Sequence, residues 1–580
     1  MRGSRALATT GATLLALAAF GGPAIAGPTH AATVTAAKDS SKPGSYVVLA
    51  QEGTSAKAVA EQLKGTGATV TSVNEDIGLI TVKTAKSGFR SAAKAVKGVD
   101  SVGADRVIGH SPTQGKARVD AVEKENLTGG STAAGETSVA AGTSNQDPLD
   151  RYLWGMRMIH ADEAHQLTLG DKRVKVGILD TGVQGDHPDL APNFDRALSR
   201  NFTTDMPDID GPCEYVGCKD PADIDNDGHG THVAGTIGAA MNDIGVSGVA
   251  PNVDIVNIRG GQDSGYFFLG PVTNALTYAG NAGIDVVNMS FYVDPWAFNC
   301  LGGAPEDTPE EAADQAMTIK AMNRALNYAH NKGVTLLGAA GNAHEDMANP
   351  RTDLSSPDYP EDAAHPRTID NKTCFDLPVE GPHVLGITSL GPSGKKSDFS
   401  NYTSDLTSGE VEFSAPGGYY RDYYGTDSFG QSTNMILSTA PLGALQAEGL
   451  VDENGRITEA GLAAGVKKQC QAVAAPGTSR CGYYQFLQGT SMATPHATGV
   501  AALVVSAHGV QKDAFNFGLK PDRVKAIMDR TAINHACPTP RTVDYLKEGR
   551  TEEFTATCVG DKNFNGFYGE GIVNALRAVK

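Results

Sequence analysis

Short apolar runs alternate with longer stretches of mixed apolar and polar residues through most of the chain. Runs such as Val176–Leu179 and Ile284–Val287 are typical of strands that are covered on both faces. The expected strands are 174–179, 253–258, 285–289, 334–339 and 383–388, and the expected helices are 229–241, 269–281 and 310–330. This alternation predicts an α/β fold in which a mostly parallel sheet is sandwiched by helices.

A smaller unit precedes this body, with its core over residues 45–108. Its pattern predicts the order strand, helix, strand, strand, helix, strand, over 45–50, 55–64, 68–73, 77–84, 88–96 and 100–108. That order is the split βαβ, or ferredoxin-like, α+β fold. Residues 27–108 hold ten Lys and Arg against seven Asp and Glu, whereas the whole chain carries a net charge of −18. Opposite charges favour association of this unit with the acidic remainder.

The first 26 residues have the pattern of an export signal. Arg2 and Arg5 provide the positive start, Ala12–Phe20 the apolar stretch, and Ala24–Ala26 the small-residue cleavage site. The apolar stretch is too short to span a bilayer, and no later run is long enough. We therefore expect a secreted, extracellular product without a membrane anchor.

A change of composition separates the small unit from the body. Residues 109–146 are rich in Gly, Ser, Thr and Ala, which cannot bury enough apolar surface to become ordered. The sequence therefore predicts an exposed, flexible linker at 109–146 and a large domain from 147 to 580.

All eight cysteines lie beyond residue 212, and an even number in an exported chain favours disulfides. Pairing each cysteine with its neighbour gives Cys213–Cys218, Cys300–Cys374, Cys470–Cys481 and Cys537–Cys558. Proximity alone supports these couples, because eight cysteines allow 105 connectivities. Zinc is the alternative, but no second couple is placed to complete a tetrahedral site with Cys213 and Cys218.

Three segments carry residues with catalytic chemistry. Asp180 ends an apolar strand and precedes Thr-Gly; His229 opens the small-residue stretch His-Gly-Thr-His; and Ser491 lies in Gly-Thr-Ser-Met-Ala, before an apolar run. Between a glycine turn and a helix start, a serine hydroxyl is exposed near free backbone N–H groups. The chain thus supplies an acid, a base and a nucleophile, in that order.

These segments, together with Gly-Ala-Ala-Gly-Asn ending at Asn342, resemble the subtilisin family of serine endopeptidases in both sequence and chain order. The resemblance covers about 147–580 and is interrupted by insertions. It implies that Ser491 attacks the peptide bond, that His229 is its base and that Asp180 orients the imidazole. Asn342 would help to hold the oxyanion. His232 is a rival base, but the family's pattern gives that role to the first histidine and packing beneath it to the second.

The small unit at 27–108 resembles the inhibitory propeptide of this family. The resemblance implies a self-inhibited zymogen that uses its own propeptide as a folding aid and inhibitor, with the maturation cut inside 109–146. A module of unrelated function is the alternative, because this fold is widely reused.

Substrate peptides are expected to add as a strand beside backbone segments of the body. By position in the family these segments contain Ser290, Phe291 and Tyr292 on one side and Gly260 and Gly261 on the other. The family usually has Ser-Leu-Gly where this chain has Ser-Phe-Tyr. The tyrosine either reshapes the first specificity pocket or blocks the groove.

Three insertions are long and rich in Gly and Pro: 293–316, 343–382 and 419–485. We expect them to be loops over the rim of the cleft. They either restrict access to the cleft or cover the surface without doing so.

An acidic insert precedes His229, and its carboxylates are dense enough to invite calcium. The candidate ligands are Asp223, Asp225 and Asp227, and a solvated acidic loop is the alternative. A second segment, starting at Asp561, imitates a calcium loop but has Ile572 where the loop needs glutamate. We therefore interpret that segment as a turn.

Three functional hypotheses follow. The first is a monomeric, calcium-supported serine endopeptidase that acts on proteins or peptides; the second is a catalytically silent binding protein on the same scaffold. The third is an esterase with the same triad, but Ala493 stands where its Gly-x-Ser-x-Gly elbow needs glycine. The strongly negative charge argues against nucleic-acid binding.

Overall fold

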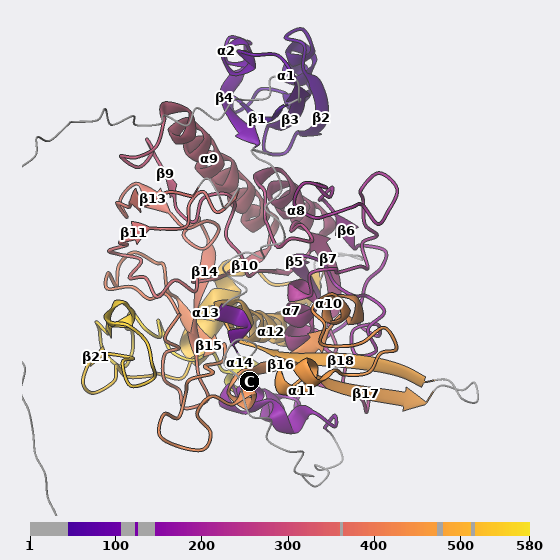
Figure 1. The fold of residues 1–580 in the computed structure, drawn as a ribbon, viewed down its shortest axis with the longest axis vertical. Coiled ribbons are helices and arrows are strands. Elements are labelled where there is room, and N and C mark those ends of the chain that lie inside the picture. Colours follow the sequence, from indigo (N-terminus) through magenta and orange to yellow (C-terminus); the bar gives the residue numbers. More distant parts are fainter. Residues whose placement is uncertain (1–43, 106–121, 126–145, 360–363, 473–478, 512–516) are drawn as a thin grey trace, which may run out of the picture. The chain divides into compact units, whose positions relative to one another are not determined.

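The computed structural model describes residues 44–105, 122–125, 146–359, 364–472, 479–511 and 517–580 (Figure 1). The expected signal at 1–26 and most of the expected linker at 109–146 lie outside these described residues. The same holds for 106–108, the end of the last strand predicted for the small unit.

The small unit has the α+β ferredoxin-like fold that its pattern predicts. Its elements are β1 (Gly44–Ala50), α1 (Ala56–Lys64), β2 (Thr69–Asn74), β3 (Leu79–Thr84), α2 (Phe89–Lys94) and β4 (Val99–Asp105). The strands form one antiparallel sheet in the order β2-β3-β1-β4. Val48, Leu63 and Phe89 are buried between the sheet and the two helices. Ser55 caps α1, since its hydroxyl accepts the N–H of Ala58 at 3.2 Å.

The body is built on a seven-stranded sheet in which every pair of neighbours is parallel. In spatial order the strands are β15 (Phe413–Pro416), β14 (Val384–Leu390), β10 (Thr335–Ala339), β8 (Val286–Met289), β5 (Lys175–Leu179), β7 (Asp254–Arg259) and β6 (Arg200–Asn201). The inner strands are almost wholly buried, as their continuous apolar runs require. This confirms the predicted α/β class.

Helices cover both faces of the sheet (Figure 1). One layer contains α7 (His229–Gly238), α12 (Thr490–His508) and α13 (Pro521–Thr531), which share a core with β5 and β14. The other contains α8 (Leu269–Ala282) and α9 (Pro309–Lys332), which share a core with β7 and β8. The shorter helices are α5 (Trp154–Met158), α6 (Ala161–Ala164) and α14 (Ala575–Ala578).

Local sequence explains the limits of α9. Thr308 and Glu311 form a reciprocal capping box, and Pro309 occupies the first helical position, where no N–H is needed. Gly333 ends the helix with φ of 102°, a conformation that favours glycine.

The insertion 419–485 does not fold as the predicted rim loop. It contains much of an antiparallel sheet, β16 (Ile436–Ala440), β18 (Ser479–Leu487) and β17 (Lys467–Ala472), and the helices α10 (Leu442–Ala447) and α11 (Glu459–Ala463). Its apolar residues, among them Leu445, Leu450 and Tyr483, bury one another in a separate small core. The insertion is therefore a folded subdomain of the body.

The insertion 293–316 contains β9 (Asn299–Cys300) and the start of α9, and 343–382 contains β11 (Thr352–Asp353), β12 (Arg367–Thr368) and β13 (Cys374–Phe375). β9 pairs with β13, and β11 pairs with β12. Near the C-terminus, β19 (Val510–Gln511) pairs with β20 (Phe517–Gly518), and β21 (Thr542–Val543) pairs with β22 (Ala556–Thr557).

Four disulfides are present: Cys213–Cys218, Cys300–Cys374, Cys470–Cys481 and Cys537–Cys558. Each of them joins cysteines that are neighbours in the sequence.

The small unit packs its sheet against α8 and α9. Val47, Leu49 and Leu79 belong to the same buried cluster as the apolar side chains of these helices. Asp314 of α9 accepts the N–H of Ala104 at 2.9 Å and pairs with Arg90 at 2.6 Å.

No helix among the described residues is both long enough and apolar enough to span a membrane.

Candidate active site

Three of the candidate residues follow the ends of neighbouring strands. Asp180 comes directly after β5, Ser290 directly after β8, and Asn342 shortly after β10. Because these strands are parallel and adjacent, their carboxyl ends lie at one edge of the sheet.

His229 begins α7 and faces Asp180. The imidazole Nδ1 lies 2.7 Å from Asp180 Oδ1, which also accepts the N–H of Thr181 at 2.8 Å. Gly230 permits this approach, since a Cβ there would lie 2.1 Å from the carbonyl oxygen of Gly182. The pair is thus held between the end of β5 and the first turn of α7.

The electrostatics of this pair follow from burial and charge. Burial raises the pKa of Asp180, and the His229 imidazole opposes that rise. For His229, burial lowers the pKa, but the charges of Asp180 and Glu123 outweigh it and raise the pKa well above 6.5. The imidazole therefore favours its protonated form while both carboxylates are present.

Ser491 lies in the first turn of α12, directly after Gly489 and Thr490. Its hydroxyl donates to the carbonyl of Ser290 at 3.3 Å, and within the described chain it has no hydrogen bond to His229. The backbone N–H groups of a first helical turn have no partner inside the helix. They are available to an anion beside the hydroxyl.

Asn342 lies beside this helix start. Its Oδ1 accepts both the N–H and the hydroxyl of Thr490, each at 2.9 Å. With the oxygen fixed in this way, the amide NH₂ is left free to donate elsewhere. Asn342, Ser491 and His229 all line one cavity of about 100 Å³.

Of the two segments expected to contact the substrate, one lines the cavity and the other does not. Ser290, Phe291 and Tyr292 line the cavity. Gly260 and Gly261 do not, because their N–H groups both donate to the carbonyl of Asp180 at 3.1 Å. Gly265, Tyr266 and Phe267 line that side instead, and Phe267 stacks on Phe291 with ring centroids 4.0 Å apart. No pattern in the sequence indicated this second segment.

Tyr292 does not close the cavity by itself. Its hydroxyl donates to Asp358 Oδ2 at 2.6 Å, so the side chain is fixed to insertion 343–382. Burial, and then the charge of Asp358, raise the pKa of Tyr292 well above its usual value. The tyrosine therefore forms part of the wall.

Residues 122–125, inside the predicted linker, lie in the same site. Glu123 is 2% exposed and lines the cavity, with Oε1 3.5 Å from His229 Nε2. The segment is anchored on both sides: Gln488 donates to the carbonyls of Val122 and Glu123, and Glu125 binds Arg421 and Arg550 at 2.6 and 3.1 Å. This part of the linker is thus buried. The sequence signal for it was the run Glu-Lys-Glu at the end of a charged stretch, 116–125, inside a linker otherwise rich in Gly, Ser, Thr and Ala.

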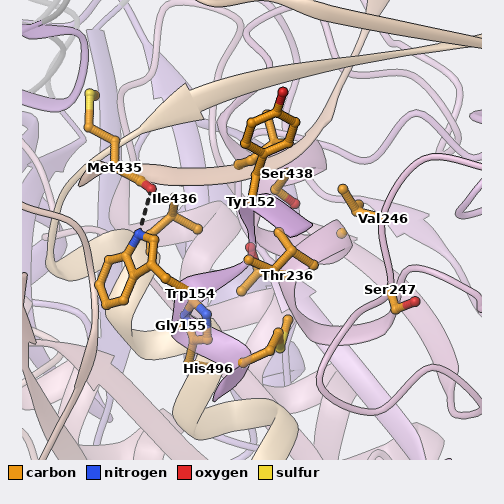
Figure 2. Close-up of a pocket in the computed structure, with 14 residues that line it drawn as sticks. Tyr152, Trp154, Gly155, Thr236, Val246, Ser247, Met435, Ile436, Ser438 and His496 are labelled. Atoms are coloured by element: carbon orange, nitrogen blue, oxygen red, sulfur yellow. Dashed lines mark hydrogen bonds between the residues drawn. The ribbon is translucent and has the colours of Figure 1, made fainter. Parts of the chain in front are cut away.

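A second cavity, shown in Figure 2, is lined in part by the helices that also carry His229 and Ser491. Its volume is about 10 Å³. It lies between α5, α7, α12 and β16, and the Trp154 indole on its wall donates to the carbonyl of Met435 at 3.1 Å. His496, from α12, also lines it, and burial lowers the pKa of this imidazole to about 4. Its role is packing. His232 is likewise structural, since its Nε2 lies 3.1 Å from the carbonyls of Ile436 and Gln485.

The acidic insert gathers carboxylates other than those the sequence suggested. Asp223 pairs with Arg196, Asp225 accepts from Thr181, Gly228 and Thr231, and Asp227 accepts the N–H of His229. These three carboxylates therefore organise the loop around α7.

A different group, Asp205, Glu214, Asp220 and Asp263, brings one oxygen from each residue within 4.8 Å of the others. Both oxygens of Asp205 and one of Asp220 are buried without a hydrogen bond. The cationic groups beside them are Arg259, which pairs with Asp220 at 2.7 Å, and Lys219. Orphaned oxygens of this kind fit a hard cation such as calcium.

Comparison with known proteins agrees with this geometry. The family model for the subtilase family matches residues 171–571. The thermostable alkaline protease of Halalkalibacterium halodurans is 26% identical over 355 residues, which cover 61% of this chain and 63% of that protein, less than two thirds of its length. Thermitase of Thermoactinomyces vulgaris is 26% identical over 337 residues, covering 58% of this chain and 94% of thermitase.

Solved structures share the fold. The epidermin leader peptide processing serine protease of Staphylococcus aureus superposes with a TM-score of 0.59 at 20% identity, covering 93% of this chain and 98% of that one. Fervidolysin of Fervidobacterium pennivorans, a keratinolytic enzyme, gives 0.50 at 19% identity, covering 93% of this chain and 61% of that one. Since the family model matches more than half of the sequence, this chain belongs to the subtilase family of serine endopeptidases.

Proposed function

We propose that the chain is a secreted serine endopeptidase that hydrolyses peptide bonds through an acyl-enzyme, with Asp180, His229 and Ser491 as its triad. The observation that carries this proposal is the 2.7 Å contact between His229 and Asp180, in the wall of a cavity that Ser491 and Asn342 also line. Asp180 and Ser491 are buried and His229 is half-buried, and His229 and Ser491 line the same cavity at the N-terminus of α12.

In this mechanism His229 takes the proton of Ser491 as the hydroxyl attacks the scissile carbonyl, and later gives it to the leaving amine. Asp180 keeps the proton of the imidazole on Nδ1 and offsets the positive charge that develops on the ring. The oxyanion is bound by the backbone N–H of Ser491 and the amide of Asn342. The peptide runs beside Ser290, Phe291 and Tyr292.

We propose further that the protein is made as a zymogen, with 1–26 as signal, 27–108 as propeptide and the maturation cut within 109–146. The contact between Glu123 and His229 supports this, because Glu123 lines the cavity beside the base and its charge helps to raise the pKa of the imidazole. The close packing of the small unit on α8 and α9 supports an inhibitor that stays in place until it is cut. The four disulfides support export, because disulfides form and persist in oxidising environments outside the cytosol.

Calcium is proposed as a structural cofactor, held by Asp205, Glu214, Asp220 and Asp263. Bound there, it would offset the mutual repulsion of these carboxylates and stabilise the insert that leads into α7. The working form is proposed to be a monomer.

The test is hydrolysis of casein by the purified, secreted protein. We expect hydrolysis by the native chain and a loss of at least about 10³-fold in Ser491→Ala. Ser506→Ala is the matched control: Ser506 lies on the same helix, but its hydroxyl donates to the carbonyl of Ala502, away from the cavity. A native chain without hydrolysis would favour the silent binding protein, and equal activity in Ser491→Ala would remove the proposed nucleophile.

A further inference from the structure

Carboxyl groups dominate the polar lining of the cavity beside Ser491. Besides Glu123 and Asp227, the side chains of Asp294, Asp358 and Asp376 line it, and they come from the insertions 293–316 and 343–382. Among the described residues, the cavity is lined by no lysine and no arginine. The cationic group among the described lining side chains is the His229 imidazole, which is already paired with Asp180 and Glu123.

Asp376 is the lining carboxylate whose side chain has the fewest polar partners in the described protein. It is 9% exposed, and its side chain has no hydrogen bond or ion pair to the described residues. A Cβ added to Gly341, the residue before Asn342, would lie 3.4 Å from its Oδ2. Burial, and then the charge of Asp353, raise the pKa of Asp376 to about 8. A nearby cation would favour the charged form of this group.

Asp294 and Asp358 form a second acidic element in the wall. Asp294 accepts the N–H of Phe267, and Asp358 accepts the hydroxyl of Tyr292 at 2.6 Å. The two carboxyl groups also hydrogen-bond to each other, so one proton is shared between them. Burial, and then the charge of Asp358, raise the pKa of Asp294 well above its usual value. A cation beside this pair would favour its charged form.

The remaining walls suit an aliphatic stem. Phe267 and Phe291 stack on one side, and Ala339 contributes from the end of β10. A long side chain with an apolar stem and a cationic head would contact these groups and bring its charge to the carboxylates.

Building on the function proposed above, we propose that this cavity binds the side chain that precedes the cleaved bond, that it selects lysine or arginine there, and that Asp376 is the main specificity-determining residue. Tyr292 contributes by holding Asp358 in the wall. Tyr292, which stands where the family usually has glycine, thus helps the cavity to recognise the charge of the substrate.

The experiment uses peptides that differ only in the residue before the cleaved bond: arginine, its neutral isostere citrulline, lysine and norleucine. The purified full chain is incubated until its peptide hydrolysis reaches a constant rate, and kcat/KM is then compared. We expect kcat/KM for arginine to exceed that for citrulline by roughly 100-fold, and Asp376→Asn to reduce this ratio to about tenfold or less.

Glu410→Gln is the matched control, since Glu410 is 8% exposed but lies outside the cavity; it should keep the full preference for arginine. A native enzyme that cleaves norleucine or citrulline peptides as well as arginine peptides overturns the inference while leaving the proposed function intact.

A second measurement does not depend on turnover. Benzamidine, a small aromatic cation, is titrated by calorimetry into the full chain carrying Ser491→Ala, with benzyl alcohol as the neutral comparison. We expect benzamidine alone to bind, and its Kd to rise at least about tenfold when Asp376→Asn is added. Binding without any peptide hydrolysis by the native chain would retain the cationic pocket and reject the protease. Equal affinity with and without Asp376→Asn would reject the role of Asp376.

Discussion

At the scale of single residues, the site depends on which partner each polar atom already has. The oxygen of Asn342 is taken by Thr490, which leaves its NH₂ group for the oxyanion. The Nδ1 of His229 is taken by Asp180, which leaves Nε2 for the serine or, in the uncut chain, for Glu123. Each proposed role is thus assigned by elimination of the other hydrogen-bonding groups.

Asn342→Asp tests the oxyanion role with little change of shape. The aspartate keeps an oxygen for Thr490 but replaces the donor NH₂ by a second oxygen. We expect kcat to fall by at least about 10²–10³-fold, the cost of an oxyanion donor in this family, with KM nearly unchanged. Steady-state kinetics on one peptide measures both values. A native kcat in this variant would exclude Asn342 from the oxyanion site.

Glu123→Gln tests the proposed electrostatic block in the uncut chain. In a Ser491→Ala background, removing one of the two carboxylates beside His229 should lower the pKa of the imidazole, while Asp180 still holds it up. Because the folded pKa is raised, this pairing stabilises the uncut chain below about pH 6.5 and is lost as pH rises through the raised value. The titration is followed by NMR of the histidine ring protons.

The control for that titration is Glu459→Gln, at the start of α11 and outside the cavity, which should leave the pKa of His229 unchanged. An unchanged pKa in Glu123→Gln as well would show that Glu123 does not act on the base.

At the scale of elements, the position of the site follows from the parallel sheet. The apolar strands before Asp180, Ser290 and Asn342 could be recognised from the sequence, and the fold then requires their ends to meet. Asp358 and Asp376 could not be placed in this way. They lie in an insertion whose pairs of two-residue strands carry no periodic pattern, so only the folded chain brings them to the cavity.

The contact between α9 and the small unit offers a test at this scale. Asp314, whose side chain is 6% exposed, binds both Arg90 and the N–H of Ala104, so Asp314→Ala removes one acceptor from two half-buried donors. We expect the cut propeptide to bind about tenfold or more weakly, and the lag before full peptide hydrolysis to shorten. Lys320→Ala removes a more exposed pair with Asp100 and should change the lag little. Equal lags in both variants would contradict a holding role for Asp314.

At the scale of the whole molecule, a buried network of charges joins the acidic insert to the body. Arg259 contacts Asp205, Asp220 and Asp263 at 3.8, 2.7 and 2.6 Å. The sequence pointed to Asp223, Asp225 and Asp227, whereas the carboxylates that cluster are Asp205, Glu214, Asp220 and Asp263. Asp225 and Asp227 accept hydrogen bonds from nearby backbone and side-chain donors. The fold of the loop therefore determines which carboxylates lack hydrogen-bond partners from the protein.

Calcium should therefore stabilise the whole body through this insert. Millimolar calcium is expected to raise Tm by about 5 °C over the same protein in chelator. Asp205→Asn should abolish most of that rise, whereas Asp223→Asn, which removes a pair with Arg196, should keep it. Scanning calorimetry of the three proteins provides the values. A full calcium response in Asp205→Asn would place the ion elsewhere.

The most direct test of the central claim is to label the matured protein with diisopropyl fluorophosphate and to locate the adduct by mass spectrometry. An activated serine reacts because a base removes its proton, so we expect one adduct, on Ser491, and none in His229→Ala. An adduct on another serine, or equal labelling of Ser491 in His229→Ala, would contradict the proposed triad.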